Sequence, residues 1–104
     1  MVGAVYIRRN KMITFEEVKE ANKVWFSEGN MRFFGDTGYW LAYNPDGNPC
    51  LIRETAMWSD MFGQEKKFVY RINRIDPETL KIQDLYDEIF KTRKEAVEFI
   101  ETLP

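Results

Sequence analysis

Two capping boxes, one near each end of the chain, constrain the fold more than any other feature of this sequence. Thr14 is followed three residues later by Glu17, and Thr92 is followed at the same spacing by Glu95. In a capping box each side chain satisfies an otherwise unpaired backbone N–H of the other residue, which fixes where a helix begins. We therefore predict one helix that starts after Thr14 and another that starts after Thr92.

Apolar residues follow both capping boxes at helical spacing. The positions that recur behind the first box are Phe15, Val18, Asn22 and Trp25, broadened by Ala21 and Val24. The apolar positions behind the second box are Ala96, Val97, Ile100 and Leu103. A stripe of this kind is one face of an amphipathic helix, so both predicted helices have a face to bury.

The middle of the chain contains a strong turn sequence between two β-favouring segments. The Asn-Pro-Asp-Gly sequence at 44–47 follows the aromatic segment 39–43 and precedes a second β-favouring segment, 49–56. Asp-Gly tolerates positive φ and proline presets a turn dihedral. We predict a β hairpin here, with a well-specified register between its strands.

A third strand is predicted over residues 67–75, where the side chains alternate between two sides. The apolar side carries Phe68, Tyr70 and Ile72 at every second position, which is the period of a strand. Residues 57–66 interrupt the pattern and are predicted to form a loop. A turn is also predicted at 35–38, ahead of the hairpin.

Residues 80–90 are compatible with a strand or a helix, because their apolar residues fit both periods. The second capping box favours a strand, since a strand leading into the new helix gives a more compact domain than two nearly continuous helices. The predicted order is then α-β-β-β-β-α. We expect an α+β fold with an antiparallel sheet of about four strands and two helices that cover one of its faces.

The first eleven residues lie outside this pattern. The apolar residues at 4–7 favour an additional edge strand, whereas a second methionine, Met12, favours an extension or a later start of translation. We therefore divide the chain into an N-terminal extension or edge strand, 1–11, and a single α+β domain, 12–104. A chain of 104 residues has room for one hydrophobic core.

The chain contains no histidine and one cysteine, Cys50. Histidine is the usual general base near neutral pH and the commonest metal ligand, so most nucleophilic triads and nearly all zinc sites need residues that this chain lacks. A free thiol is typical of a reducing compartment, and the apolar runs are too short for a membrane span. We expect a cytoplasmic protein that is not an enzyme, with no catalytic residues, metal site, cofactor or membrane partner.

Two segments carry a resemblance to a known family. They are TFEEVKEANKVWFSEGNMRFFGD at 14–36 and FKTRKEAVEFIETL at 90–103. They resemble a family of small uncharacterised proteins from phages and other mobile elements, with a leading helix, an MRFF stretch, several strands and a terminal F-x-T-x-x-E-A helix. The residues that match this pattern are Trp25, Phe26, Met31, Arg32, Phe33, Phe34, Thr92, Glu95 and Ala96. The resemblance implies a mobile-element setting and the same element order, and it supplies no activity.

The predicted loop over 57–66 is the preferred candidate for a binding surface. Loops run over the surface of a domain, and aromatic residues and methionine are enriched at the centres of interfaces. The candidate contacts are Trp58, Asp60, Met61, Phe62 and Glu65. In a mobile-element setting they lead to the hypothesis of an accessory protein that binds an unidentified host protein, as an inhibitor of a host defence system of the anti-CRISPR kind.

Other aromatic groups lie at 25–26 and 31–34. We interpret both clusters as core, because large apolar side chains are mostly buried in a small domain and the first helix needs something to pack against.

Single-stranded nucleic acid is the alternative partner. Cations beside aromatic rings suit phosphate pairing and base stacking. The strand residues of these types are Arg53, Lys66, Lys67, Arg71, Arg74, Trp40 and Tyr70. A net charge of −2, from 15 basic and 17 acidic residues, opposes this hypothesis. A self-associating structural protein is the third hypothesis.

Overall fold

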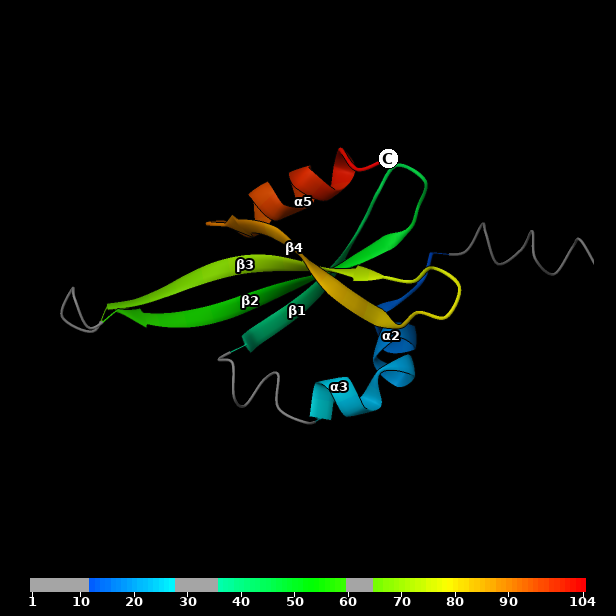
Figure 1. The fold of residues 1–104 in the computed structure, drawn as a ribbon, viewed down its shortest axis with the longest axis horizontal. Helices are drawn as coiled ribbons and strands as arrows, with labels where there is room; N and C mark the ends of the chain where they lie inside the picture. Colours follow the sequence, from blue (N-terminus) through cyan, green and yellow to red (C-terminus); the bar gives the residue numbers. More distant parts are fainter. Residues whose placement is uncertain (1–11, 28–35, 60–64) are drawn as a thin grey trace, which may run out of the picture.

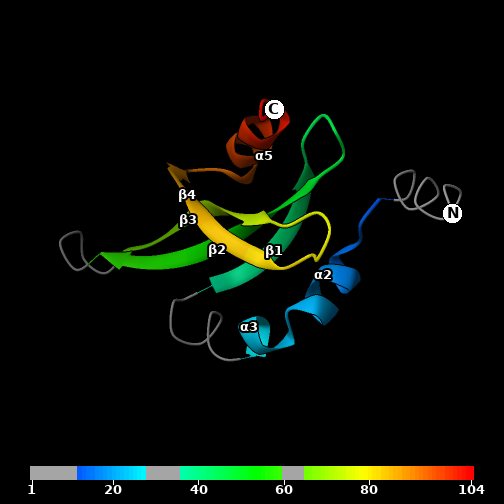
Figure 2. The ribbon, with the colours of Figure 1, turned by 45° about the vertical axis from the view of Figure 1, so that its right-hand side comes forward.

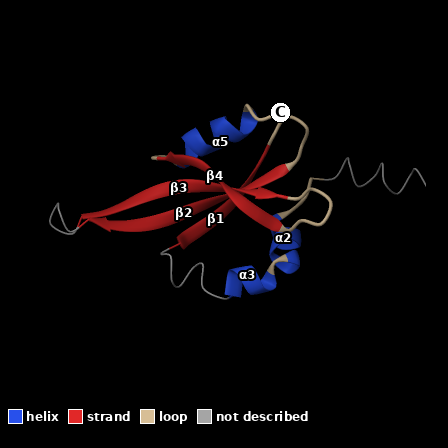
Figure 3. Cartoon of the chain, viewed as in Figure 1, coloured by secondary structure: helices blue, strands red, loops and turns tan. Residues whose placement is uncertain are grey.

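The computed structural model describes residues 12–27, 36–59 and 65–104, and it has an α+β fold (Figure 3). One antiparallel sheet has the strand order β1-β2-β3-β4. Its strands are β1 (Asp36–Tyr43), β2 (Pro49–Ser59), β3 (Glu65–Ile75) and β4 (Ile82–Phe90). The helices are α2 (Phe15–Ala21), α3 (Lys23–Ser27) and α5 (Arg93–Glu101). The predicted order of helices and strands is confirmed, and the ambiguous segment 80–90 contributes a strand.

The helices lie on opposite faces of the sheet (Figures 1 and 2). α5 packs on the face that carries Ile52 and Ile72, whereas α2 and α3 pack on the face that carries Leu51 and Ile75. The expectation that both ends of the chain cover one face is wrong. Leu51 and Ile52 are consecutive and both fully buried. Because consecutive strand residues point to opposite faces, each face needs a cover of its own.

The first helical segment begins at the predicted capping box. The Glu17 backbone N–H donates to Thr14 Oγ1 at 3.2 Å, and the Thr14 backbone N–H donates to Glu17 Oε1 at 3.1 Å. The single helix expected from the sequence is divided at Asn22, which caps α2 with φ −131° and ψ 42° before α3 starts. The break positions the Asn22 side chain for contacts with the sheet.

Asn22 links the α2–α3 junction to the connection between β3 and β4 through side-chain hydrogen bonds. Its Nδ2 donates to the carbonyl oxygens of Val18 and Leu80, each at 2.7 Å, and its Oδ1 accepts from the Ile82 backbone N–H at 2.9 Å. Leu80 has φ 63°, a left-handed conformation that costs a residue with a Cβ about 1–2 kcal/mol. The buried amide of Asn22 thus helps to hold this strained turn against the helices.

The β1–β2 hairpin is confirmed at the predicted turn. Asn44 Oδ1 accepts from the backbone N–H groups of Asp46 and Asn48, each at 2.9 Å, and Gly47 has φ 83°. β1 begins at Asp36, so the turn predicted at 35–38 is wrong for its described residues, 36–38. A bulge between Asp36 and Gly38 accommodates them. A Cβ on Gly38 would lie 2.9 Å from Trp40 Cη2, so glycine makes room for that ring.

The β2–β3 hairpin is longer than predicted. Met57 pairs with Lys67 and Ser59 pairs with Glu65, so residues 57–59 and 65–66 of the loop predicted at 57–66 are strand. Trp58 is a β-favouring residue, which suits the continuation of the ladder past Ala56. Trp58 is therefore a strand residue rather than a loop residue, and residues 60–64 lie outside the described part of the chain.

The face covered by α5 holds an apolar core. Ala96 and Ile100 of α5 are fully buried against strand residues that include Ile52 and Ile72. Thr92 is the N-cap of α5, and its Oγ1 accepts from the Glu95 backbone N–H at 3.1 Å, as predicted. The Glu95 carboxylate accepts from the Thr92 hydroxyl at 3.2 Å instead of from the Thr92 backbone N–H, so the predicted N-cap forms without the reciprocal bond of a full capping box.

Cys50 lies in this apolar core as a free, buried thiol. Burial raises the pKa of the Cys50 thiol, which disfavours the reactive thiolate. This environment is that of a small apolar core residue rather than of a nucleophile.

Candidate binding groove

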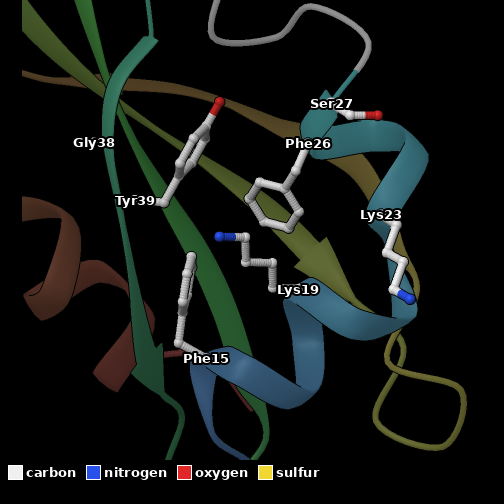
Figure 4. Close-up of a pocket in the computed structure, with 7 residues that line it drawn as sticks. All are labelled: Phe15, Lys19, Lys23, Phe26, Ser27, Gly38 and Tyr39. Atoms are coloured by element: carbon white, nitrogen blue, oxygen red, sulfur yellow. The ribbon is translucent and has the colours of Figure 1, made fainter.

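An open groove lies between α2, α3 and the start of β1 (Figure 4). Its volume is about 580 Å³. The residues that line it are Phe15, Lys19, Lys23, Phe26, Ser27, Gly38 and Tyr39. We call this site the aromatic groove.

Three aromatic rings form the apolar part of the groove. The Phe26 ring lies edge-to-face with Phe15 at 5.8 Å and with Tyr39 at 5.2 Å between ring centroids. Edge-to-face pairs at such separations are mutually attractive. The three rings are half-buried and rest on the buried cluster of Val18, Leu51 and Ile75. The core therefore holds the rings in place and leaves part of each one open to the groove.

Two lysines supply the charge of the groove. The Lys19 side chain points between the rings of Phe15 and Tyr39, whereas Lys23 extends away from them (Figure 4). Lys23 Nζ lies 2.9 Å from Glu20 Oε1, but both side chains are about 70% exposed, so this ion pair is worth little. None of the described residues that line the groove is acidic. The groove thus combines an apolar wall with positive charge.

A buried ionic network lies behind the Tyr39 side of the groove. Asp36 Oδ2 accepts from the Tyr39 hydroxyl at 2.7 Å and from Arg53 Nε at 3.0 Å, and Asp36 Oδ1 accepts from the Thr55 hydroxyl at 2.7 Å. Arg53 Nη2 also lies 3.0 Å from Asp36 Oδ2. The Asp36 and Arg53 side chains are 0% and 9% exposed. The network fixes the orientation of the Tyr39 ring and anchors the irregular start of β1.

The network also changes the ionisation of Tyr39. Burial and the hydrogen bond to Asp36 both raise the pKa of the Tyr39 hydroxyl above its ordinary value. The hydroxyl therefore stays protonated at neutral pH and serves as a hydrogen-bond donor to Asp36. Its role at the groove is to hold the ring in place.

A second group of polar residues lies on the face covered by α5. The hydroxyls of Tyr70 and Thr37 both donate to the Glu54 carboxylate. These hydrogen bonds lower the pKa of Glu54, and the one from Tyr70 has the larger effect. Nearby, the Arg93 guanidinium lies 4.4 Å from the centre of the Trp40 ring. Glu54 is thus paired with two hydroxyl groups, and Arg93 is paired with the Trp40 ring.

Of the sequence-predicted protein-binding residues, Trp58 and Glu65 are on the β2–β3 hairpin, away from the aromatic groove. Trp58 is in β2 and Glu65 is the first residue of β3. Asp60, Met61 and Phe62 lie outside the described residues. As a surface for binding, this hairpin stays a prediction.

The structure divides the predicted nucleic-acid-binding residues between the two faces of the sheet. Arg53 and Arg71 pair across β2 and β3 and so share the face of α2 and α3, whereas Trp40 and Tyr70 pack on the face of α5. Arg53 is buried and paired with Asp36, which leaves it unavailable to phosphate.

The other cations of that set lie elsewhere on the sheet. Arg74 forms an ion pair with Asp84 at 2.9 Å and stacks on Tyr86 at 3.8 Å. Lys66 and Lys67 lie further out on the β2–β3 hairpin. Because Tyr86 packs on the α5 side, Arg74 shares that face with Trp40 and Tyr70, whereas Arg53 and Arg71 are on the other face.

Sequence reasoning missed the aromatic groove. It singled out Trp25 and Phe26 and interpreted them as core, and these side chains do pack against the buried cluster. The remaining signal was Lys19, which is one turn after Phe15 and therefore on the same side of the predicted helix. The contribution of Tyr39 depends on how β1 is placed against α3, which no local pattern supplies.

Comparison of the chain with protein-family models, with curated proteins and with solved structures gave no match. Within the described ranges, no three acidic or cysteine side chains are grouped so that they could hold a metal ion. The described helices are also all too short or too polar to cross a membrane.

Proposed function

We propose that the protein is a non-enzymatic accessory protein that binds a partner protein through the aromatic groove. In keeping with the sequence resemblance, we propose a phage or another mobile element as its setting and a host defence protein as its target. The observation that carries the binding proposal is an open apolar groove, built on a rigid core, with an ammonium group aimed into it.

The composition of the groove supports a protein partner. Rings that are held in place and partly exposed lose little conformational entropy on binding, and such aromatic anchors dominate the energy of protein interfaces. The positive charge of Lys19 and Lys23 favours a partner surface with acidic residues around a large apolar side chain.

Charge reversal in the groove tests the proposal. The double variant Lys19→Glu, Lys23→Glu changes two exposed side chains and leaves the rings intact. In affinity capture from nuclease-treated host lysate, we expect it to retain the partner about tenfold less well than the unchanged protein, since like charges would then meet at the interface. The matched control is Lys91→Glu, Lys94→Glu, which makes the same charge change at exposed positions next to and within α5.

The outcomes separate the competing hypotheses. Equal capture by both double variants would overturn the role of the groove. Loss of capture in Trp58→Ala, Phe62→Ala, with normal capture by the groove variant, would move the interface to the β2–β3 hairpin. Capture that disappears on nuclease treatment would favour nucleic acid as the partner.

A further inference from the structure

β1 forms one edge of the sheet and also borders the aromatic groove. Among the described residues, the sheet order places β1 beside β2 alone, and Gly38 and Tyr39 of β1 line the groove. An edge strand presents unpaired backbone N–H and C=O groups, which another chain can bind as an additional strand.

The hairpin geometry shows which backbone groups face outward. The Asn44 backbone N–H donates to the Asn48 carbonyl at 2.9 Å, which makes this facing pair hydrogen-bonded. In an antiparallel ladder such pairs alternate, so Ala42 and Trp40 bond to β2, whereas the backbone groups of Tyr39 and Leu41 point away from it. In the part of the chain that the structure describes, no backbone partner is recorded for these outward groups of Tyr39 or Leu41.

This open edge has a defined end. The Tyr43 hydroxyl donates to the Ile13 carbonyl, so the segment before α2 crosses near that end of β1. The accessible stretch therefore lies beside Tyr39 and Leu41, directly at the aromatic groove.

The opposite edge of the sheet differs in its charge. β4 carries the exposed acidic residues Asp84, Asp87 and Glu88, and charges of this kind are a common protection of edge strands against unwanted pairing. β1 has one charged residue, Asp36, whose carboxylate is buried in the network with Arg53. The protein thus protects one edge with charge and leaves the other without it.

We propose that an extended, acidic segment of the partner adds to β1 as a fifth strand. The outward backbone groups of Tyr39 and Leu41 hydrogen-bond to this segment. One large apolar side chain of the segment enters the aromatic groove, and carboxylates of the segment face Lys19 and Lys23. This inference rests on the proposed function and specifies its mode of recognition. Because side chains alternate along a strand, the residues next to the apolar one point away from the groove.

A random peptide library displayed on particles supplies the probe. After selection on the immobilised protein, we expect acidic sequences with a large aromatic or aliphatic residue. The selected peptide is then synthesised with single backbone N-methyl groups, each of which removes one N–H and keeps every side chain. We expect affinity to fall about tenfold for N-methylation at alternate positions and to change little at the positions between them.

Amide hydrogen exchange provides an independent readout on the protein. Saturating peptide should slow exchange at Tyr39 and Leu41 by about tenfold or more, since these N–H groups become hydrogen-bonded. The control is Ile89, which pairs with Arg71 and lies on the β4 edge, where exchange should not change.

The other outcomes overturn either strand addition or the chemistry assigned to the partner segment. Binding that is insensitive to N-methylation and does not protect Tyr39 would leave a groove that recognises side chains alone, and the proposed function would stand. Selected sequences without acidic residues would contradict the assigned chemistry. If no library peptide is retained, strand addition is wrong, while the lysate capture with the Lys19 and Lys23 variants decides the proposed function separately.

Amide exchange in the free protein tests the other possible occupants of the β1 edge. Protection of Tyr39 and Leu41 that rises with protein concentration would identify a second copy of the chain as the added strand. Protection without peptide that is independent of concentration would mean that the chain covers its own edge. Either result would overturn the proposal.

Discussion

The two faces of the sheet bury different kinds of side chain. On the face of α5, the buried residues are apolar and include Ile52, Ile72 and Ile100. On the face of α2 and α3, a smaller apolar cluster lies beside the buried polar residues Asn22, Asp36, Arg53 and Asn73. Apolar burial is nondirectional, whereas buried ion pairs and amides accept few arrangements. The first face therefore contributes mainly stability, and the second also sets the positions of the residues around the aromatic groove.

The sharpest test of this comparison is Asp36→Ala, which leaves Arg53 buried without its counterion. We expect the free energy of unfolding to fall by about 4 kcal/mol, measured by urea denaturation. Adding Arg53→Met should recover much of the loss, because the double variant no longer buries an unpaired charge. The matched control is Asp84→Ala, which removes an exposed partner of Arg74. Similar losses for Asp36→Ala and Asp84→Ala would show that the buried network is energetically unimportant.

On the face of α5, the corresponding test is Ile100→Ala. Its side chain is fully buried in the apolar cluster, so the change leaves a cavity and should cost about 3 kcal/mol in urea denaturation. Val97→Ala on the same helix removes a half-buried side chain and should cost less. A loss below about 1 kcal/mol for Ile100→Ala would mean that this face is loosely packed.

Asn22→Ala tests the attachment of the helices to the sheet. The change leaves the Leu80 carbonyl and the Ile82 N–H without their partner, and we expect a loss of about 2 kcal/mol. If the substitution accelerates amide exchange at Ile82 more than at Ile72, the effect is localised to the β3–β4 connection. An unchanged exchange rate at Ile82 would contradict the proposed link.

Alkaline pH should produce the smallest effect, and it acts through Tyr39. The folded pKa of Tyr39 is raised above its unfolded value near 10, so its contribution is complete below pH 10 and is lost as the pH rises through the folded pKa. We expect the urea midpoint to fall as the pH rises above about 10. The fall should be shallower in Tyr39→Phe. Residual loss is expected there, because the pKa values of Tyr43 and Tyr70 are also raised. An equally steep fall in both proteins would rule out Tyr39 as a source.

Local signals in the sequence predicted the element order well. The N-caps at Thr14 and Thr92 and the turn at 44–47 depend on residues a few positions apart, and all three occur where expected. The strand over 80–90 followed from its neighbour, since a helix start immediately after it left little room for a second helix.

Features that depend on distant residues were not predictable in the same way. The burial of Arg53 is possible because Asp36, 17 positions earlier, lies beside it, whereas the sequence shows only a basic residue in a strand. The groove likewise joins a helix to a strand edge. The placement of the helices on opposite faces was indicated by the consecutive residues Leu51 and Ile52, but a single pair of this kind does not determine which helix covers which face.

The hydrogen bonds of Asn22 also bear on how the molecule assembles. They close loops of 58 and 60 residues, whereas every strand pair is joined by a direct connection to the next strand. Closing a long loop costs more entropy than forming a local hairpin, so we expect the meander to form early and α2 with α3 to dock late. Pulse-labelled exchange should then protect the Ile82 N–H after that of Ile72, and simultaneous protection would contradict this order. A late docking step would make the aromatic groove a property of the completed fold, absent from any folding intermediate that lacks the N-terminal helices.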